Sequence, residues 1–254
     1  MARPYPASVI RLLKACEAEV RNSIDTKDEL ALADVLLPMA EAIYDPDGPR
    51  SSGRKKIKSR EVFLERLFFD FRELIAAYQI LVDFPTLARS RPPRSQGLSP
   101  ARLASFWREA YLNELYIFLC RVDAYMARIV RNYRRERSLA ALPSFLTHMR
   151  ELINSRLGDF IEMRGGHVHR RRYEYTDPEL HRLQLLEMLA TGSKIPEFRK
   201  LYREAARTAK VNNTETFRLI TREAKDCLKG VFDSFEGFML DREGRLVYPS
   251  NLKT

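Results

Sequence analysis

The chain of 254 residues is 45% hydrophobic, which is enough to bury a substantial core in one large domain or two small ones. Its 44 basic residues exceed its 34 acidic residues, and the resulting formal charge of +10 favours polyanionic partners. The sequence has no zinc-type cysteine spacing, Gly-rich phosphate loop, H-E-x-x-H or G-x-S-x-G motif, which argues against the enzyme classes that depend on them.

The cysteines and the apolar runs indicate where in the cell the protein is expected. Cys16, Cys120 and Cys227 are far apart and odd in number, which suits reduced thiols in a cytosolic protein better than a disulfide framework. Charged residues interrupt the apolar positions of the N-terminus, and no run reaches the roughly 18 apolar residues of a membrane span. We therefore expect a cytoplasmic protein with no membrane partner.

The residue pattern is that of helices. Only 10 glycines are spread over the chain, and the alternating runs of Val, Ile or Thr that mark strands are missing. We predict an all-α fold, an antiparallel multi-helix bundle with N- and C-terminal helical extensions. The whole of residues 1–254 is expected to form a single helical domain.

The first elements in chain order are two helices and a loop. Apolar positions recur at helical spacing over residues 7–23, with charged residues between them. A second helical segment is predicted over residues 28–44, where Pro38 should kink or split it. Residues 45–58 combine turn formers with a cationic cluster and have no apolar face, so we expect a loop there.

A core helix is predicted next, with Ser59 as its cap. Its apolar residues follow each other at three- and four-residue steps from Phe63 to Tyr78. Their aromatic rings could serve as a stacking platform for single strands, but a continuous stripe at this spacing is typical of a core. Residues 85–99 contain three prolines and a glycine and are expected to be a connecting loop.

The longest predicted helix begins at Ser99 and Pro100 and continues to about Arg137. Near its C-terminal half four arginines recur at helical steps and share a face: Arg121, Arg128, Arg131 and Arg135. This face could bind phosphates, and Arg128, Arg131 and Arg135 are candidate nucleic-acid contacts. A solvated charged stripe, favoured by the helix dipole, is the alternative.

Ser144 is predicted to cap a helix that reaches about Met163. Gly165-Gly166 is expected to interrupt this helix, because glycines adopt conformations closed to other residues. Arg164 would then lie at a helix end, with His169 just beyond it.

Three more helices complete the prediction. Asp177-Pro178 should cap and begin a helix that runs to about Ala190 and stops at Gly192. Residues 196–209 are expected to form a short basic helix. A last long helix is predicted from Asn213 or Thr214 to about Leu240.

The stretch Arg164-Gly-Gly-His-Val-His169, between amphipathic helices, resembles the HEPN superfamily, whose ribonuclease members carry R-x(4–6)-H. The resemblance covers residues 60–190, which would be a HEPN-like core. Family members usually place Asn, Asp or His directly after the arginine, where this chain has Gly165. His167 could take the missing polar role.

The resemblance implies an RNA-binding protein and metal-independent endoribonuclease activity without a cofactor, in which the RNA 2′-hydroxyl attacks its own phosphate. His169 would act as general base or acid, and Arg164 would hold the phosphate and stabilise the transition state. A homodimer with two motifs facing one cleft is also implied, as is an RNA partner. Three further arginines would line the approach: Arg170, Arg171 and Arg172.

Other interpretations remain open for these residues. Arg164 could pair with a carboxylate, His169 could be a structural histidine, and His167 and His169 could ligate a metal, although no complete ligand set is evident. Gly165 favours a non-catalytic helical module for dimerisation or for sensing nucleotides or RNA. A helical nucleic-acid-binding or scaffold protein of an unrelated family would also explain the charge and the helices. The sequence does not identify an antitoxin-type protein partner.

Overall fold

The computed structural model describes residues 5–23, 60–89, 98–133, 142–169, 177–250 and 252. Within these residues the chain forms six helices and no strand, apart from an isolated bridge between Leu240 and Leu246. This confirms the predicted all-α helical bundle. The predicted helix over residues 28–44, the predicted loop over 45–58 and the cap at Ser59 lie outside the described residues.

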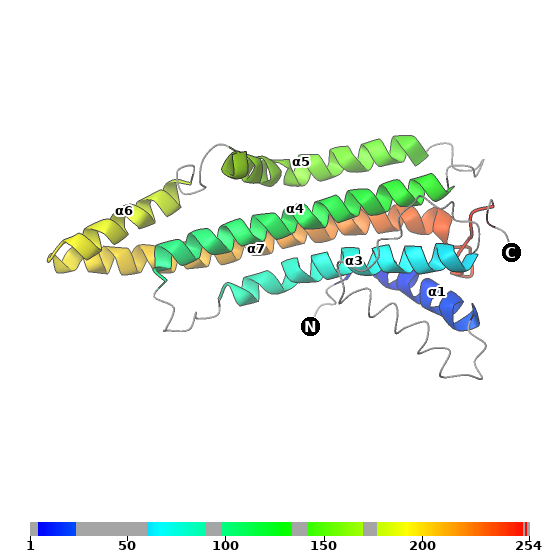
Figure 1. Cartoon of the computed structure of the whole chain (residues 1–254), viewed down its shortest axis with the longest axis horizontal. Helices are drawn as coiled ribbons and strands as arrows, with labels where there is room; N and C mark the ends of the chain where they lie inside the picture. Colours follow the sequence, from blue (N-terminus) through cyan, green and yellow to red (C-terminus); the bar gives the residue numbers. More distant parts are fainter. Residues whose placement is uncertain are drawn as a thin grey trace. The chain divides into compact units, whose positions relative to one another are not determined.

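The helices are shown in Figure 1. Their bounds are Ala7–Ser23 for α1, Arg60–Leu87 for α3, Pro100–Tyr133 for α4, Leu142–His169 for α5, Pro178–Gly192 for α6 and Pro196–Met239 for α7. The chain divides into two compact units, and the single domain expected from the sequence stays a prediction. Unit 1 comprises residues 1–74, 124–147 and 228–254, and unit 2 comprises residues 75–123 and 148–227.

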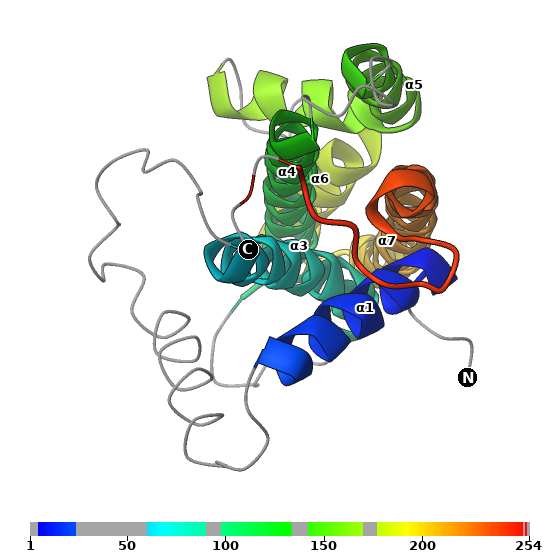
Figure 2. The ribbon, with the colours of Figure 1, turned by 90° about the vertical axis from the view of Figure 1, so that its right-hand side faces the viewer.

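Unit 1 has an aromatic core. Tyr125 of α4 stacks on Phe232 of α7 with ring centroids 5.7 Å apart, and Phe71 of α3 meets the same Phe232 ring edge-on at 5.6 Å. Figure 2 shows α1 beside the C-terminal end of α7, where Arg11 pairs with Glu236. The stripe predicted from Phe63 to Tyr78 is largely buried, which confirms that α3 is a core helix.

Unit 2 is also built around aromatic rings. Tyr111 of α4 stacks on Phe217 of α7 at 4.4 Å, and its hydroxyl donates to the Phe217 carbonyl at 2.9 Å. Phe84 of α3 meets the Tyr111 ring edge-on at 5.1 Å and that of Trp107 at 5.6 Å. The side chains that make this core therefore come from α3, α4 and α7.

Helix α3 continues past Pro85 to Leu87, into the segment expected to be a connection. Proline has no N–H, so the carbonyl four residues before it loses its helical donor. That carbonyl belongs to Leu81, and it accepts a hydrogen bond from the Thr221 hydroxyl at 3.0 Å instead. A side chain of α7 thus satisfies the group that the proline leaves open.

Helix α7 is continuous from Pro196 to Met239, so the prediction of two separate helices is wrong. Asn213 and Thr214 are residue types that favour helix starts. Instead the Thr214 hydroxyl donates to the Lys210 carbonyl at 2.9 Å, and Asn213 makes contacts with α4. Both side chains are therefore satisfied in the middle of the helix.

Candidate functional site

The predicted catalytic residues lie at the end of α5. The helix runs through Gly165-Gly166 to His169, so the expected helix end near Met163 is wrong. Glycine destabilises a helix interior by only about 1 kcal/mol relative to alanine, and this helix tolerates the pair. Arg164, His167 and His169 therefore share one helical backbone, and their side chains lie outside the described part.

The spacing along this helix restricts how Arg164 and His169 could cooperate. Five residues of α-helix correspond to a rise of about 7.5 Å and a turn of about 140° around the axis. The backbone positions of Arg164 and His169 therefore lie on different sides of the helix axis.

The structure describes only some of the candidate nucleic-acid contacts. Arg128 pairs with Asp70 of α3, and Arg131 is exposed in the last turn of α4. Arg135 and the run from Arg170 to Arg172 lie outside the described residues. Arg128 and Arg131 are both exposed and lie three residues apart on α4, so the described part places these two predicted contacts side by side, with Arg128 already paired to Asp70.

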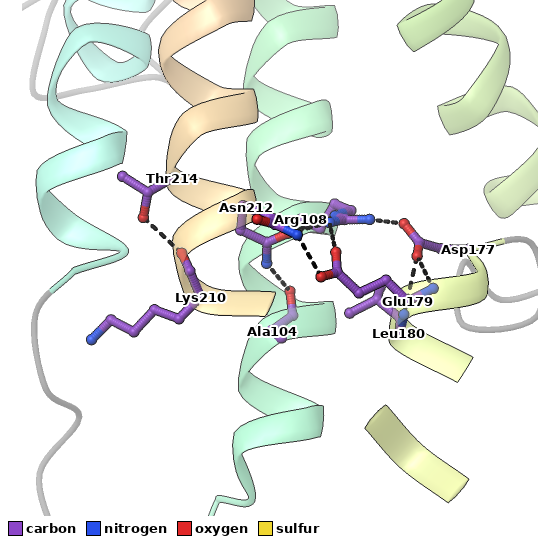
Figure 3. A network of polar contacts seen from close by, with 9 residues as sticks. Ala104, Arg108, Asp177, Glu179, Leu180, Lys210, Asn212 and Thr214 are labelled. Atoms are coloured by element: carbon purple, nitrogen blue, oxygen red, sulfur yellow. Dashed lines mark hydrogen bonds and ion pairs between the residues drawn. The ribbon is translucent and has the colours of Figure 1, made fainter. Parts of the chain in front are cut away.

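A buried polar network lies where α6 begins, and sequence analysis did not identify it (Figure 3). Arg108 of α4 is only 8% exposed. Its guanidinium pairs with the Asp177 carboxylate, donates from Nε to Asn213 Oδ1 at 2.8 Å, and lies 3.7 Å from Glu179 Oε2. A charge this deeply buried is stable only when it is paired and hydrogen-bonded, as it is here.

The partners of Arg108 are themselves held. Asp177 accepts hydrogen bonds from the backbone N–H groups of Glu179 and Leu180 at 2.8 and 3.0 Å, which makes it the N-cap of α6 as predicted. Asn213 Nδ2 donates to the Ala104 carbonyl at 3.2 Å.

These contacts fix the start of α6 to α4 and α7, so we call this group of residues the Arg108 clamp. Its ionic and amide groups already bind one another, which suits a structural role better than catalysis. It holds Asp177, the first described residue after the run from Arg170 to Arg172. No short motif marks the clamp in the sequence, because Arg108 and Asn213 are 105 residues apart.

A second polar group lies at the N-terminus of α4. The Ser99 hydroxyl accepts from the Arg102 N–H at 3.2 Å, which confirms the predicted cap. The Tyr202 hydroxyl donates to Glu187 at 3.2 Å, and burial together with this carboxylate raises the pKa of Tyr202 to about 12.

An open pocket of about 530 Å³ lies beside these residues. It is lined by Ser99, Arg102, Glu187, Met188, Thr191 and Gly192. Its lining combines one exposed cation with one carboxylate that is already bonded to Tyr202. This pocket therefore offers no set of groups that points to a particular ligand.

Across the described ranges no three His, Cys, Asp or Glu side chains gather as metal ligands would. The described helices also include none with the length and apolar character of a membrane span. No family model, curated protein or solved structure matches the chain.

Proposed function

We propose that the protein binds RNA as a HEPN-like helical protein, through the junction between α5 and α6. The observation that carries the proposal is the position of the arginine run. Arg170, Arg171 and Arg172 follow directly on the last residue of α5, and the next described residue, Asp177, is fixed by the Arg108 clamp. Both ends of an arginine-rich connection are thus attached to helices.

Charge supports the same proposal. The formal charge of +10 attracts a phosphate backbone, and arginine donates paired hydrogen bonds that match phosphate oxygens. Contacts to phosphates release condensed counterions, so binding should weaken as salt rises.

The test is the triple substitution of Arg170, Arg171 and Arg172 by alanine. The affinity for single-stranded RNA at low salt should fall by about 10-fold or more, and the salt dependence should become shallower. An unchanged affinity would show that the RNA-binding surface lies elsewhere. Undetectable binding by the wild-type protein at low salt would overturn the proposal itself.

Metal-independent cleavage is the second candidate function, and the continuous helix from Arg164 to His169 favours a form of it shared between two chains. In a symmetric dimer, Arg164 of one chain and His169 of the other would serve one phosphate. His169 would move the proton of the 2′-hydroxyl, and Arg164 would stabilise the extra negative charge. The non-catalytic RNA-binding module is the alternative.

Cleavage is tested with RNA in the presence of a chelator, by looking for 2′,3′-cyclic phosphate termini. Arg164→Ala and His169→Ala should each abolish it, and RNA methylated at the 2′-hydroxyl of the scissile position should resist. Mixing the two inactive variants should restore about a quarter of wild-type activity if each site takes one residue from each chain. RNA that wild type binds but never cuts would favour the non-catalytic module.

A further inference from the structure

We infer that the first half of α7 carries a second surface for the phosphate backbone of RNA, formed by Arg199, Arg203 and Arg207. We call these residues the α7 arginine row. This inference rests on the proposed RNA binding, and it concerns a surface separate from the α5–α6 junction. All three side chains are exposed.

The row lies along one side of the helix. Its members follow at steps of four, so successive residues are about 40° apart around the axis and roughly 6 Å apart along it. Arg203 Nε donates to the Arg199 carbonyl at 3.2 Å. By the same helical geometry Glu197 and Glu204 lie about 160° and 140° from Arg199, but Glu204 lies only about 60° from Arg207, three residues before it. The row therefore presents a line of positive charge to an extended polyanion, with one carboxylate beside its last member.

The row belongs to the exposed arginines that have no acidic partner in the described part of the chain. Elsewhere Arg11 pairs with Glu236, Arg150 with Asp123, and Arg245 with Asp241. Among the described residues no carboxylate oxygen lies within ion-pair distance of any member of the row. Their charge is therefore available to an external anion.

The helix that carries the row contacts α6 and is buried from Ala209 onward on one side. Figure 1 shows the first half of α7 beside α6, and the Tyr202 hydroxyl donates to Glu187 of α6 at 3.2 Å. Ala209 is completely buried, and Lys210 Nζ donates at 2.8 Å to the carbonyl of Arg89, two residues past the end of α3. Cations on a rigid helix lose less freedom on binding than cations on a loop, which favours tight contact.

The apolar residues near the row bear on whether its partner is a nucleic acid or a membrane. Interfacial helices combine cations with a broad apolar face that enters the lipid. On α7 the exposed Leu201 lies about 160° around the axis from Arg203, whereas the exposed Val211 lies four residues beyond Arg207, in line with the row. One valine at the end of the row is not such a face, so the charge of the row favours a phosphate backbone. The row itself also has no aromatic ring for base stacking, so it should contact phosphates without reading sequence.

The test replaces Arg199, Arg203 and Arg207 together by glutamine in the full chain and measures binding of single-stranded RNA against salt. Affinity at low salt should fall by about 10-fold or more, and the slope of log affinity against log salt should shrink by about 2, because each single-strand phosphate contact contributes about 0.7. Tryptophan fluorescence of Trp107 checks that unit 2 remains folded.

The matched control removes three other arginines, each of which already pairs with a carboxylate. It is the triple glutamine variant of Arg150, Arg156 and Arg245. It has the same net charge as the row variant and should keep wild-type affinity within about 2-fold. Equal losses in both variants would reduce the effect to overall charge and overturn the inference.

The remaining outcomes separate the two proposals. If wild type binds RNA and the row variant binds equally well, the α7 surface is refuted and the proposed function stands. If the wild-type protein binds no RNA, both the proposed function and the α7 surface are refuted. If the row variant keeps RNA binding but loses binding to vesicles of anionic lipid, the surface belongs to a membrane and the inference is wrong.

Discussion

Replacing Arg108 by methionine should strongly destabilise unit 2. Methionine keeps most of the length of the side chain and removes the cation, so Asp177 and Asn213 lose their central partner. Breaking a buried ion pair by removal of one partner costs about 3–5 kcal/mol. The side chains of Arg108 and Asp177 are 10% and 14% exposed, and this residual contact with water puts the expected loss of unfolding free energy at about 3 kcal/mol, the lower end of that range.

Urea denaturation followed by Trp107 fluorescence measures this loss directly. Trp107 is the only tryptophan, and it packs against Phe84 at 5.6 Å in unit 2, next to Arg108 in the sequence. The signal therefore reports the unfolding of the unit that holds the clamp. The midpoint should fall at an unchanged denaturant slope.

Arg150→Met provides the control. Arg150 pairs with Asp123 in the same unit, but both side chains are about half exposed, at 48% and 47%. An exposed pair contributes about 0–1 kcal/mol, so this variant should stay close to wild type. If Arg108→Met cost no more than Arg150→Met, the clamp would not stabilise unit 2 and the argument from burial would be wrong.

Three more outcomes are expected. Cys120 is exposed, whereas burial raises the pKa of Cys16 to about 12 and that of Cys227 to about 11. A thiol reagent at pH 8 should therefore label one thiol quickly in the native protein and three in urea. Two quickly labelled thiols in the native protein would contradict this. Burial raises the pKa of Asp70 above 3.8, so the ionisation of this carboxyl opposes folding. The wild-type protein should therefore gain stability relative to Asp70→Asn as the pH falls from neutral towards about 4. A stability difference between the two proteins that does not change with pH would contradict this role. Light scattering at high micromolar concentration should show a homodimer, and a monomer would count strongly against a shared site.

The sequence predicted the elements whose signals are local. Asp177 and Ser99 were expected as caps because each precedes a proline that can begin a helix, and both accept hydrogen bonds from the first turn. The apolar stripe of α3 indicated a buried face, since residues at three- and four-residue steps lie on one side of a helix.

Features that depend on distant partners could not be predicted in this way. Asn213 carries a helix-start signal, but its side chain bonds to Arg108, 105 residues away, and α7 continues. Pro85 signals a helix end, yet Thr221 of α7 satisfies the carbonyl that Pro85 leaves open. In each case a tertiary hydrogen bond overrides a local preference, and a single sequence does not show which residues meet.

The candidate site shows the same division. The sequence identifies the spacing of Arg164 and His169, and the structure adds that one helix carries both. No feature of the sequence singles out Arg108, because an arginine inside a helical pattern is normally solvated. The burial of Arg108 follows only from the packing of α4 against α6 and α7.

The most direct test of RNA binding is the salt dependence of the wild-type protein with single-stranded RNA in a chelator. Affinity should be measurable at low salt and fall linearly on a log–log plot, with a slope of about −0.7 for each phosphate contact. A slope steeper than about −2 is expected, because the junction and the α7 row together offer several arginines. Absent binding at low salt, or an affinity indifferent to salt, would contradict the proposal that this protein recognises RNA through its cationic surface.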